Sequence, residues 1–155
     1  MVFAWNSQTK TATIIREYMP GSNSMKAGLA AGLVESKHST AVENDGEGGP
    51  GDDPKLTAAK HELEEECQLV GGEWIKLTGD TLLDKYSTTQ ATVYLNLNAS
   101  VTNNPKPLDA EEDITVMPNV TIAEILGMIV KGEMNCVGGW ASLIAIERLR
   151  ELGEI

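Results

Sequence analysis

The stretch AAKHELEEECQL, residues 58–69, decides how the rest of this chain is interpreted. On a helix, Glu62, Glu65 and Glu66 stand at positions i, i+3 and i+4, so their side chains share one face. Like charges at these spacings cost about 0.2–0.5 kcal/mol per pair. Carboxylates that converge from a rigid backbone are the ligands that Mg²⁺ and Mn²⁺ prefer. The pattern alone leaves two interpretations open, a metal site or a solvated acidic helix.

The helix that carries these carboxylates is predicted over residues 55–70. Asp53 and Pro54 are typical of an N-cap and a first helical position, and Gly71-Gly72 are typical of a helix end. A neighbouring face carries small or apolar side chains, namely Ala59, Leu63 and Cys67. We therefore interpret Cys67 as a small core residue and not as a nucleophile.

The remaining elements follow from hydrophobic patterning and turn residues. Short apolar or β-branched runs predict strands at residues 2–5, 11–18, 29–35, 73–77, 91–97 and 114–117. In the fifth run, apolar residues alternate with Thr92, Tyr94 and Asn96, which predicts a half-buried strand. Two closing helices are expected, one capped by Thr121 and one over residues 140–152. Trp74 and Trp140 are expected in the core or at an interface. This order predicts an α/β sandwich around a mixed sheet.

Composition excludes several classes of function. The chain has 155 residues, with 23 acidic against 12 basic side chains and a formal net charge of −11. Such an anionic surface is a poor non-specific binder of nucleic acid or anionic membrane, so neither partner is expected. Two distant cysteines without CxxC spacing, no secretory signal and no long apolar run predict a single cytoplasmic domain over residues 1–155.

Residues 62–69 also resemble the second half of the Nudix hydrolase signature. That signature reads Gly, five residues, Glu, seven residues, Arg-Glu, an aliphatic residue, one residue, Glu-Glu, one residue, Gly and an aliphatic residue. The segment Glu62-Leu63-Glu64-Glu65-Glu66-Cys67-Gln68-Leu69 matches every acidic and aliphatic position of that half. Ala58-Ala59 precede it, as is frequent in the family.

Other segments resemble the ADP-ribose and nucleotide-sugar pyrophosphatase branch of this family. Residues 30–35 (AAGLVE) are similar to its Pro-Ala-Gly-Leu strand, and residues 14–20 (IIREYMP) are similar to its Arg-Glu-Tyr-Arg-Pro strand. Residues 108–114, a Thr-Ile-Ala-Glu helix start and residues 131–133 follow the branch in order. The resemblance covers nearly the whole chain and implies a Nudix-type α/β/α sandwich with a central mixed β-sheet.

The resemblance also implies the roles of individual residues. Glu62, Glu65, Glu66 and the backbone carbonyl of Ala31 are expected to bind Mg²⁺, with Mn²⁺ as an alternative. A carboxylate must accept the proton of the attacking water, and the expected catalytic residues are Glu112, Glu111 and Glu65. An ordinary acidic loop is the alternative for Glu111 and Glu112. Expected substrate contacts come from Arg16 and Glu35. A strand-edge ion pair is an equal alternative for Arg16.

The chain departs from the signature at several positions. Residues 36–53 form an insertion inside the motif, and they hold glycines but almost no large apolar residue, which predicts a flexible surface loop. The middle glutamate has no clean equivalent, with Asp52 or Asp53 nearest. His61 stands where the signature has arginine, Gln68 where it has glycine, and Met19 where the branch has a substrate-binding arginine.

Taken together, these patterns predict Mg²⁺-dependent hydrolysis of a nucleoside diphosphate linked to another moiety, such as ADP-ribose or a related nucleotide sugar. The product would be a nucleoside monophosphate. The alternative is a non-catalytic Nudix-like nucleotide-binding or protein-interaction module, which the altered positions motivate. The resemblance further implies a homodimer.

Overall fold

A six-stranded mixed sheet forms the centre of the structure, a computed structural model that describes residues 1–34, 53–106 and 113–155. The strand order is β10-β2-β1-β8-β5, and β3 pairs with β2 outside this path. Strands β1 and β8 run parallel, and the other pairs are antiparallel. The strands are β1 (Val2–Asn6), β2 (Thr11–Met19), β3 (Ser24–Gly28), β5 (Glu73–Lys76), β8 (Tyr94–Leu97) and β10 (Ile114–Val120).

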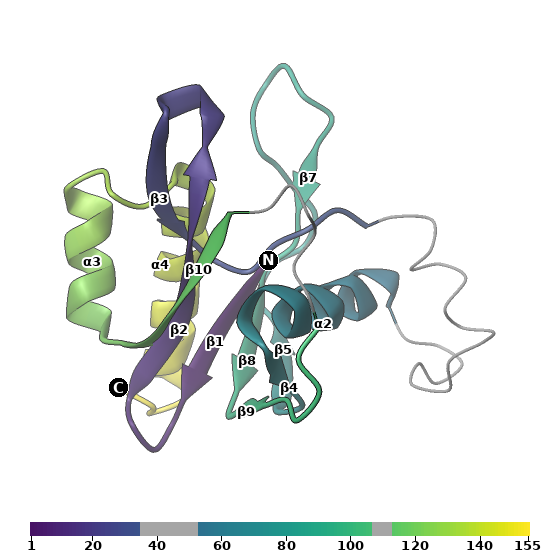
Figure 1. Ribbon diagram of the computed structural model, residues 1–155, viewed down its shortest axis with the longest axis vertical. Coiled ribbons are helices and arrows are strands. Elements are labelled where there is room, and N and C mark those ends of the chain that lie inside the picture. The colour runs from purple at the N-terminus through teal and green to yellow at the C-terminus, as the bar shows by residue number, and fades with distance from the viewer. Residues whose placement is uncertain (35–52, 107–112) are drawn as a thin grey trace.

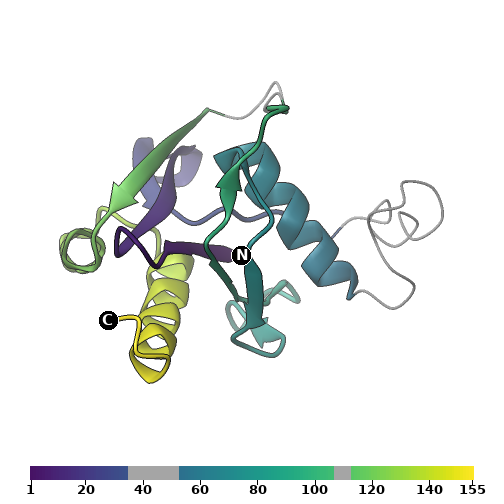
Figure 2. The ribbon, with the colours of Figure 1, turned by 90° about the horizontal axis from the view of Figure 1, so that it is seen from below.

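Helices cover both faces of this sheet (Figure 1). Helix α2 (Pro54–Cys67) lies on one face, whereas α3 (Ile122–Val130) and α4 (Cys136–Glu151) lie on the other, as the view from below shows (Figure 2). The described part of the chain contains no helix long and apolar enough to cross a membrane. The three layers are those of an α/β/α sandwich.

Two hydrophobic cores result, one on each face, because side chains alternate along the strands. On β1, Phe3 and Trp5 pack with α3 and α4, whereas Val2 and Ala4 pack with α2. The predicted core role of Cys67 is confirmed, since this side chain is buried in the α2 core. The two predicted core tryptophans, Trp74 and Trp140, are partly buried and pack against the cores.

The third strand lies earlier than predicted. It occupies Ser24–Gly28 and forms a hairpin with β2 around a short 3₁₀ turn, η1 (Pro20–Ser22). Asn23 closes the turn in the left-handed region, with φ 49°, a conformation that asparagine tolerates. The apolar run at residues 29–34 contributes one isolated bridge, between Ala30 and Val2, and is otherwise not a strand. The strand at residues 29–35 was predicted from apolar content alone.

Helix α2 ends three residues earlier than predicted, at Cys67. Gln68 adopts a left-handed conformation with φ 57°, while its backbone N–H still bonds the Glu64 carbonyl. Leu69–Val70 then form β4, which pairs with β9 (Ser100–Val101). Gln68 stands where the Nudix signature has glycine, a residue that adopts a positive φ without steric cost.

The other closing elements are largely as predicted. Thr121 caps α3 through a capping box with Glu124, which confirms that expectation. Helix α4 begins at Cys136, earlier than predicted, because Asn135 caps it.

Strand β8 is buried at all four positions, so the prediction of a half-buried strand was wrong. The reason is that α2 covers the face that carries Tyr94.

Candidate functional site

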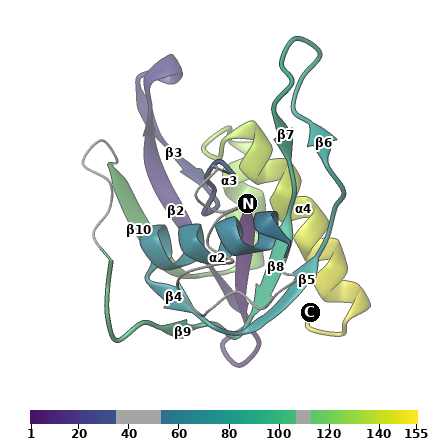
Figure 3. The ribbon, with the colours of Figure 1, turned by 90° about the vertical axis from the view of Figure 1, so that its right-hand side faces the viewer.

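A cavity of about 700 Å³ opens beside α2. Its lining comes mainly from the first half of α2, the segment 29–34, the end of β2, the start of α4 and a small hairpin, and Met1 also contributes. The hairpin consists of β6 (Thr81–Leu82) and β7 (Gln90–Ala91) and extends in the same direction as the β2–β3 hairpin (Figure 3). A cavity of this size accommodates a nucleotide-sized molecule.

Two of the three predicted metal-binding carboxylates lie against the segment 29–34. Glu66 is buried, with 5% of its surface exposed, and its Oε2 accepts a hydrogen bond of 2.9 Å from the Ala31 N–H. Glu62, one turn earlier on α2, lines the cavity. The helical spacing therefore brings both carboxyl groups to the same short stretch of backbone.

Gly32 shows how closely Glu62 approaches this backbone. A Cβ atom added at Gly32 would collide with the carboxylate of Glu62, so an alanine fits only if that carboxylate moves. Glycine is thus required here for a close approach and not for a special backbone angle. Gly32, part of the AAGLVE run that resembles the pyrophosphatase branch, is thus the residue that permits this close approach.

Met1 also lies at the cavity, on the side of the two carboxylates. The amino group of Met1 donates a 3.1 Å hydrogen bond to the Thr92 carbonyl, and Met1 lines the cavity. Burial lowers the pKa of this amino group, and the negative charges of Glu62 and Glu66 partly oppose that shift. The negative charges of Glu62 and Glu66 therefore both act on the Met1 amino group.

Glu65, the third predicted ligand, is half-buried on α2 and is not among the described residues that line the cavity. Within the described ranges, no group of three or more Asp, Glu, His or Cys side chains is arranged to hold a metal ion. The three-carboxylate ligand set therefore remains a prediction. His61, which replaces the signature arginine, is half-buried on the same helix.

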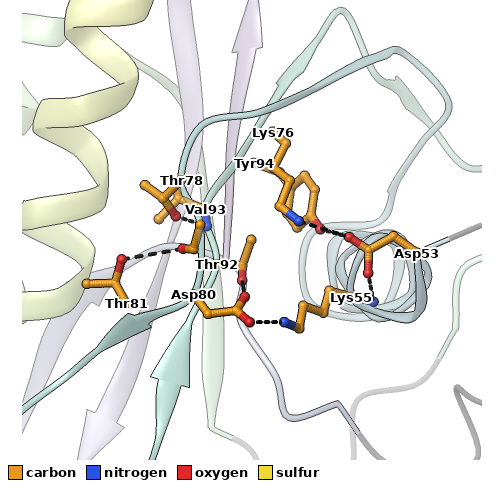
Figure 4. Close-up of polar contacts among 10 residues, drawn as sticks. Asp53, Lys55, Lys76, Thr78, Asp80, Thr81, Thr92, Val93 and Tyr94 are labelled. Atoms are coloured by element: carbon orange, nitrogen blue, oxygen red, sulfur yellow. Dashed lines mark hydrogen bonds and ion pairs between the residues drawn. The ribbon is translucent and has the colours of Figure 1, made fainter.

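A polar network joins the start of α2 to the strands beside it (Figure 4). Asp53 caps the helix through a 3.0 Å bond from the Lys55 N–H, and its other oxygen accepts bonds of 3.1 Å from Lys76 and from the Tyr94 hydroxyl. The backbone N–H of Lys55 is the main cause of the lowered pKa of Asp53. Burial, together with the Asp53 charge, raises the pKa of Tyr94. The predicted N-cap at Asp53 is confirmed.

The side chain of Lys55 points into the cavity and meets the arm that carries the β6–β7 hairpin (Figure 4). Its Nζ lies 2.5 Å from Asp80 Oδ2, and Asp80 Oδ1 accepts a 2.9 Å hydrogen bond from the Thr92 hydroxyl. Hydrogen bonding with Lys55 lowers the pKa of Asp80. The sequence offered no motif for this contact, because it joins residues that are 25 positions apart.

Strand β2 presents different residues to the cavity than the sequence suggested. Glu17 and Met19 line it, whereas Arg16 is exposed and is not among the described lining residues. Asn135, the N-cap of α4, approaches Glu17 with a 3.4 Å hydrogen bond. Met19, which replaces an arginine of the resembled branch, thus does lie in the cavity. Either role of Arg16 remains a prediction.

Several predicted residues lie outside the described ranges. Glu35, expected to contact substrate, and Glu111 and Glu112, expected to be catalytic, belong to residues 35–52 and 107–112. The same holds for the insertion at 36–53, apart from Asp53. The expected roles of these residues therefore remain predictions.

Comparison with known proteins supports the fold class. No protein-family profile matches the chain, and no curated protein matches it. One similar solved structure is the crystal structure of an ADP compounds hydrolase, with a TM-score of 0.68 and 18% sequence identity. The match covers 99% of this chain and 74% of the other. At this identity the likeness establishes the fold alone, and it confirms the predicted α/β fold with a mixed central sheet.

Proposed function

We propose that this protein hydrolyses the phosphoanhydride bond of a nucleoside diphosphate linked to another moiety, using Mg²⁺. One observation carries the proposal. One helix positions Glu62 and Glu66 against the Ala31–Gly32 backbone, with Glu62 lining a cavity of nucleotide size and Glu66 buried beside it, outside the described lining. Glu66 is buried and bonded to the Ala31 N–H, so it does not belong to a solvated acidic helix face.

The donor set fits a magnesium ion. Mg²⁺ is typically bound by one or two carboxylates together with water and substrate phosphates. Glu62 and Glu66 would hold it, with Glu65 and the Ala31 carbonyl as the further ligands implied by the resemblance; Mn²⁺ would suit the same oxygens. When bound, such an ion neutralises phosphate charge and lowers the pKa of water.

The chain's own residues supply orientation and charge. The Ala31 N–H holds one oxygen of Glu66, which leaves the rotation of that carboxylate fixed. Lys55 lines the cavity, where it is paired with Asp80. Glu112 or Glu111 is proposed to accept the proton of the attacking water, as the resemblance implies.

ADP-ribose or a related nucleotide sugar is the proposed substrate, and a nucleoside monophosphate the proposed product. The resemblance of residues 14–20 and 30–35 supports this choice, and the similar solved structure is that of a hydrolase of ADP compounds. A homodimer is proposed from the same resemblance, and a light-scattering mass near 16.7 kDa would contradict it.

A substrate screen with product identification tests the proposal. Purified protein is incubated with nucleotide sugars, dinucleotides and nucleoside triphosphates, with and without Mg²⁺. Glu62→Gln and Glu66→Gln should each reduce turnover about 100-fold or more, because a lost ligand charge removes several kcal/mol of stabilisation. Glu147→Gln on the exposed side of α4 is the matched control. Absence of hydrolysis across the panel would refute the proposal.

A nucleotide-binding module without catalysis is the second candidate. The observation that favours it is the lack of a three-carboxylate group among the described residues. Calorimetry separates the two functions. Tight nucleotide binding without turnover, unchanged in Glu66→Gln, would favour the module.

A further inference from the structure

The β6–β7 hairpin forms one wall of the cavity although little holds it in place. Its strands pair at two positions, Thr81 with Ala91 and Leu82 with Gln90, and the Leu83 N–H donates a further 3.2 Å hydrogen bond to the Thr89 carbonyl. Its tip is closed by local bonds, in which Asp84 accepts the N–H groups of Tyr86 and Ser87. Nevertheless, five cavity-lining residues come from this hairpin: Leu83, Thr88, Thr89, Gln90 and Ala91.

Exposed apolar side chains gather around the mouth of this cavity. Leu33 and Val34 on one segment are 72% and 49% exposed, and Leu83 on the hairpin is 39% exposed. All three line the cavity. Leu82 and Tyr86, which are 58% and 87% exposed, lie on the same hairpin. Apolar surface that gathers at a concave site is typical of a ligand-binding surface, because isolated surface leucines do not cluster in this way.

The hairpin also offers polar groups at the cavity. Thr88 and Gln90 are exposed there, and within the described residues no hydrogen bond engages either side chain. Hydroxyl and amide groups of this kind recognise the polar edge of a nucleobase or the hydroxyls of a sugar. They are neutral, so they are poorly suited to hold phosphate charge.

One ion pair ties the hairpin's arm to α2. Lys55 and Asp80 meet at 2.5 Å, and Asp80 binds Thr92 on the returning strand, which continues into β8. The base of the arm is closed by Val93, whose N–H donates a 3.0 Å hydrogen bond to the Thr78 hydroxyl. The pair thus links the hairpin's arm to the helix that carries Glu62.

We propose that the β6–β7 hairpin is the specificity wall of the cavity. It binds the organic moiety of the substrate, with Leu83 and Leu33 contacting the flat apolar face of a nucleobase and Gln90 contacting its polar edge. The Lys55–Asp80 pair positions this wall, while the phosphates lie toward Glu62. This inference rests on the proposed function, since it assigns a different part of the same substrate to each wall.

Calorimetry with two non-hydrolysable probes tests the assignment in the presence of Mg²⁺. One probe is a methylene-bridged analogue of ADP-ribose, and the other is methylenediphosphonate, which has no organic moiety. Leu83→Ser should weaken the analogue about tenfold, because an apolar contact is lost, and Gln90→Ala should weaken it about fivefold. Neither variant should change the affinity for methylenediphosphonate. Leu143→Ser, at a 48% exposed leucine on α4, is the matched control and should bind both probes like the wild type.

Hydrogen exchange tests the positioning role separately. Asp80→Asn should accelerate exchange of the hairpin amides about tenfold, whereas Glu151→Gln, which breaks the exposed Arg148–Glu151 pair on α4, should leave them unchanged.

The possible outcomes separate the inference from the proposed function. Unchanged affinity in the hairpin variants, equal loss for both probes, unchanged exchange in Asp80→Asn, or no wild-type binding of the analogue would each overturn the inference. If the wild type binds the analogue and the hairpin variants weaken it, but no compound of the substrate panel is hydrolysed, the proposed function fails and the inference stands.

Discussion

The two walls of the cavity differ in how they are built. Helix α2 packs into a hydrophobic core through Ala59, Leu63 and Cys67, and its carboxylates approach the Ala31–Gly32 backbone. The β6–β7 hairpin has exposed side chains at most positions and a ladder of two residue pairs. One wall is thus held by burial, and the other by an ion pair at its base.

This difference indicates which wall is expected to bind the metal and which is expected to select the organic moiety of the substrate. Groups that bind a metal must keep their geometry within a fraction of an ångström, and packed helices provide such rigidity. Groups that choose among organic moieties tolerate looser support and commonly lie on loops. The following experiments test this difference between the two walls.

The largest expected effect concerns the two cysteines, which report on the rigidity of α2. Burial raises the pKa of Cys67 to about 12, and the Glu66 charge adds to that shift. At pH 8 only about one Cys67 in ten thousand is then a thiolate, the form that reacts. We expect the exposed Cys136 to react rapidly with a thiol reagent and Cys67 to react only after unfolding. Rapid labelling of both thiols in the native protein would contradict a rigid wall.

Gly32→Ala should separate activity from stability. The added methyl group displaces the Glu62 carboxylate, which is the far end of a flexible side chain, so the fold adapts at little cost. We expect turnover to fall about 100-fold, since one proposed metal ligand is misplaced, while the melting temperature changes little. Gly127→Ala on α3, where a Cβ meets nothing within 4 Å, is the control. Full activity in Gly32→Ala would show that Glu62 need not occupy its present position.

Asp53→Ala should have the smallest effect, on stability. It removes the N-cap of α2 and the bonds to Lys76 and Tyr94, which should cost about 1–2 kcal/mol of unfolding free energy. The folded-state pKa of Asp53 lies below its ordinary value of 3.8, so this stabilisation is complete above that value. It is lost as the pH falls through the folded-state pKa.

Urea unfolding of wild type and Asp53→Ala at neutral pH and near pH 3 checks this dependence. The difference between the two proteins should shrink in acid. Glu151→Ala, which breaks an exposed pair, should change stability by less than about 0.5 kcal/mol at neutral pH. An Asp53 effect that does not depend on pH would rule out a contribution of its charge.

Elements with strong local signals were predicted well from the sequence. The N-cap at Asp53, the capping box at Thr121 and the strand after residue 11 depend on neighbouring residues and are confirmed. Elements that depend on distant partners were predicted poorly. Strand β3 is defined by its pairing with β2, and the full burial of β8 depends on α2, which covers it.

The candidate site divides in the same way. Glu62 and Glu66 were identified because helical spacing places them on one face, a local property of the chain. The closeness of Gly32 to Glu62, the meeting of Lys55 with Asp80 and the orientation of β2 that turns Glu17 and Met19 inward are products of packing between elements. No local pattern records such contacts.

The sequence by itself determined which helix carries the carboxylates and that the fold belongs to the α/β class, since periodicity and capping act over a few residues. Only the tertiary structure decided which carboxylates reach the cavity and what faces them. The reason is that a cavity exists where elements far apart in the chain fail to fill space. Its walls, from Gly32 to Gln90, are therefore set by sheet order and packing.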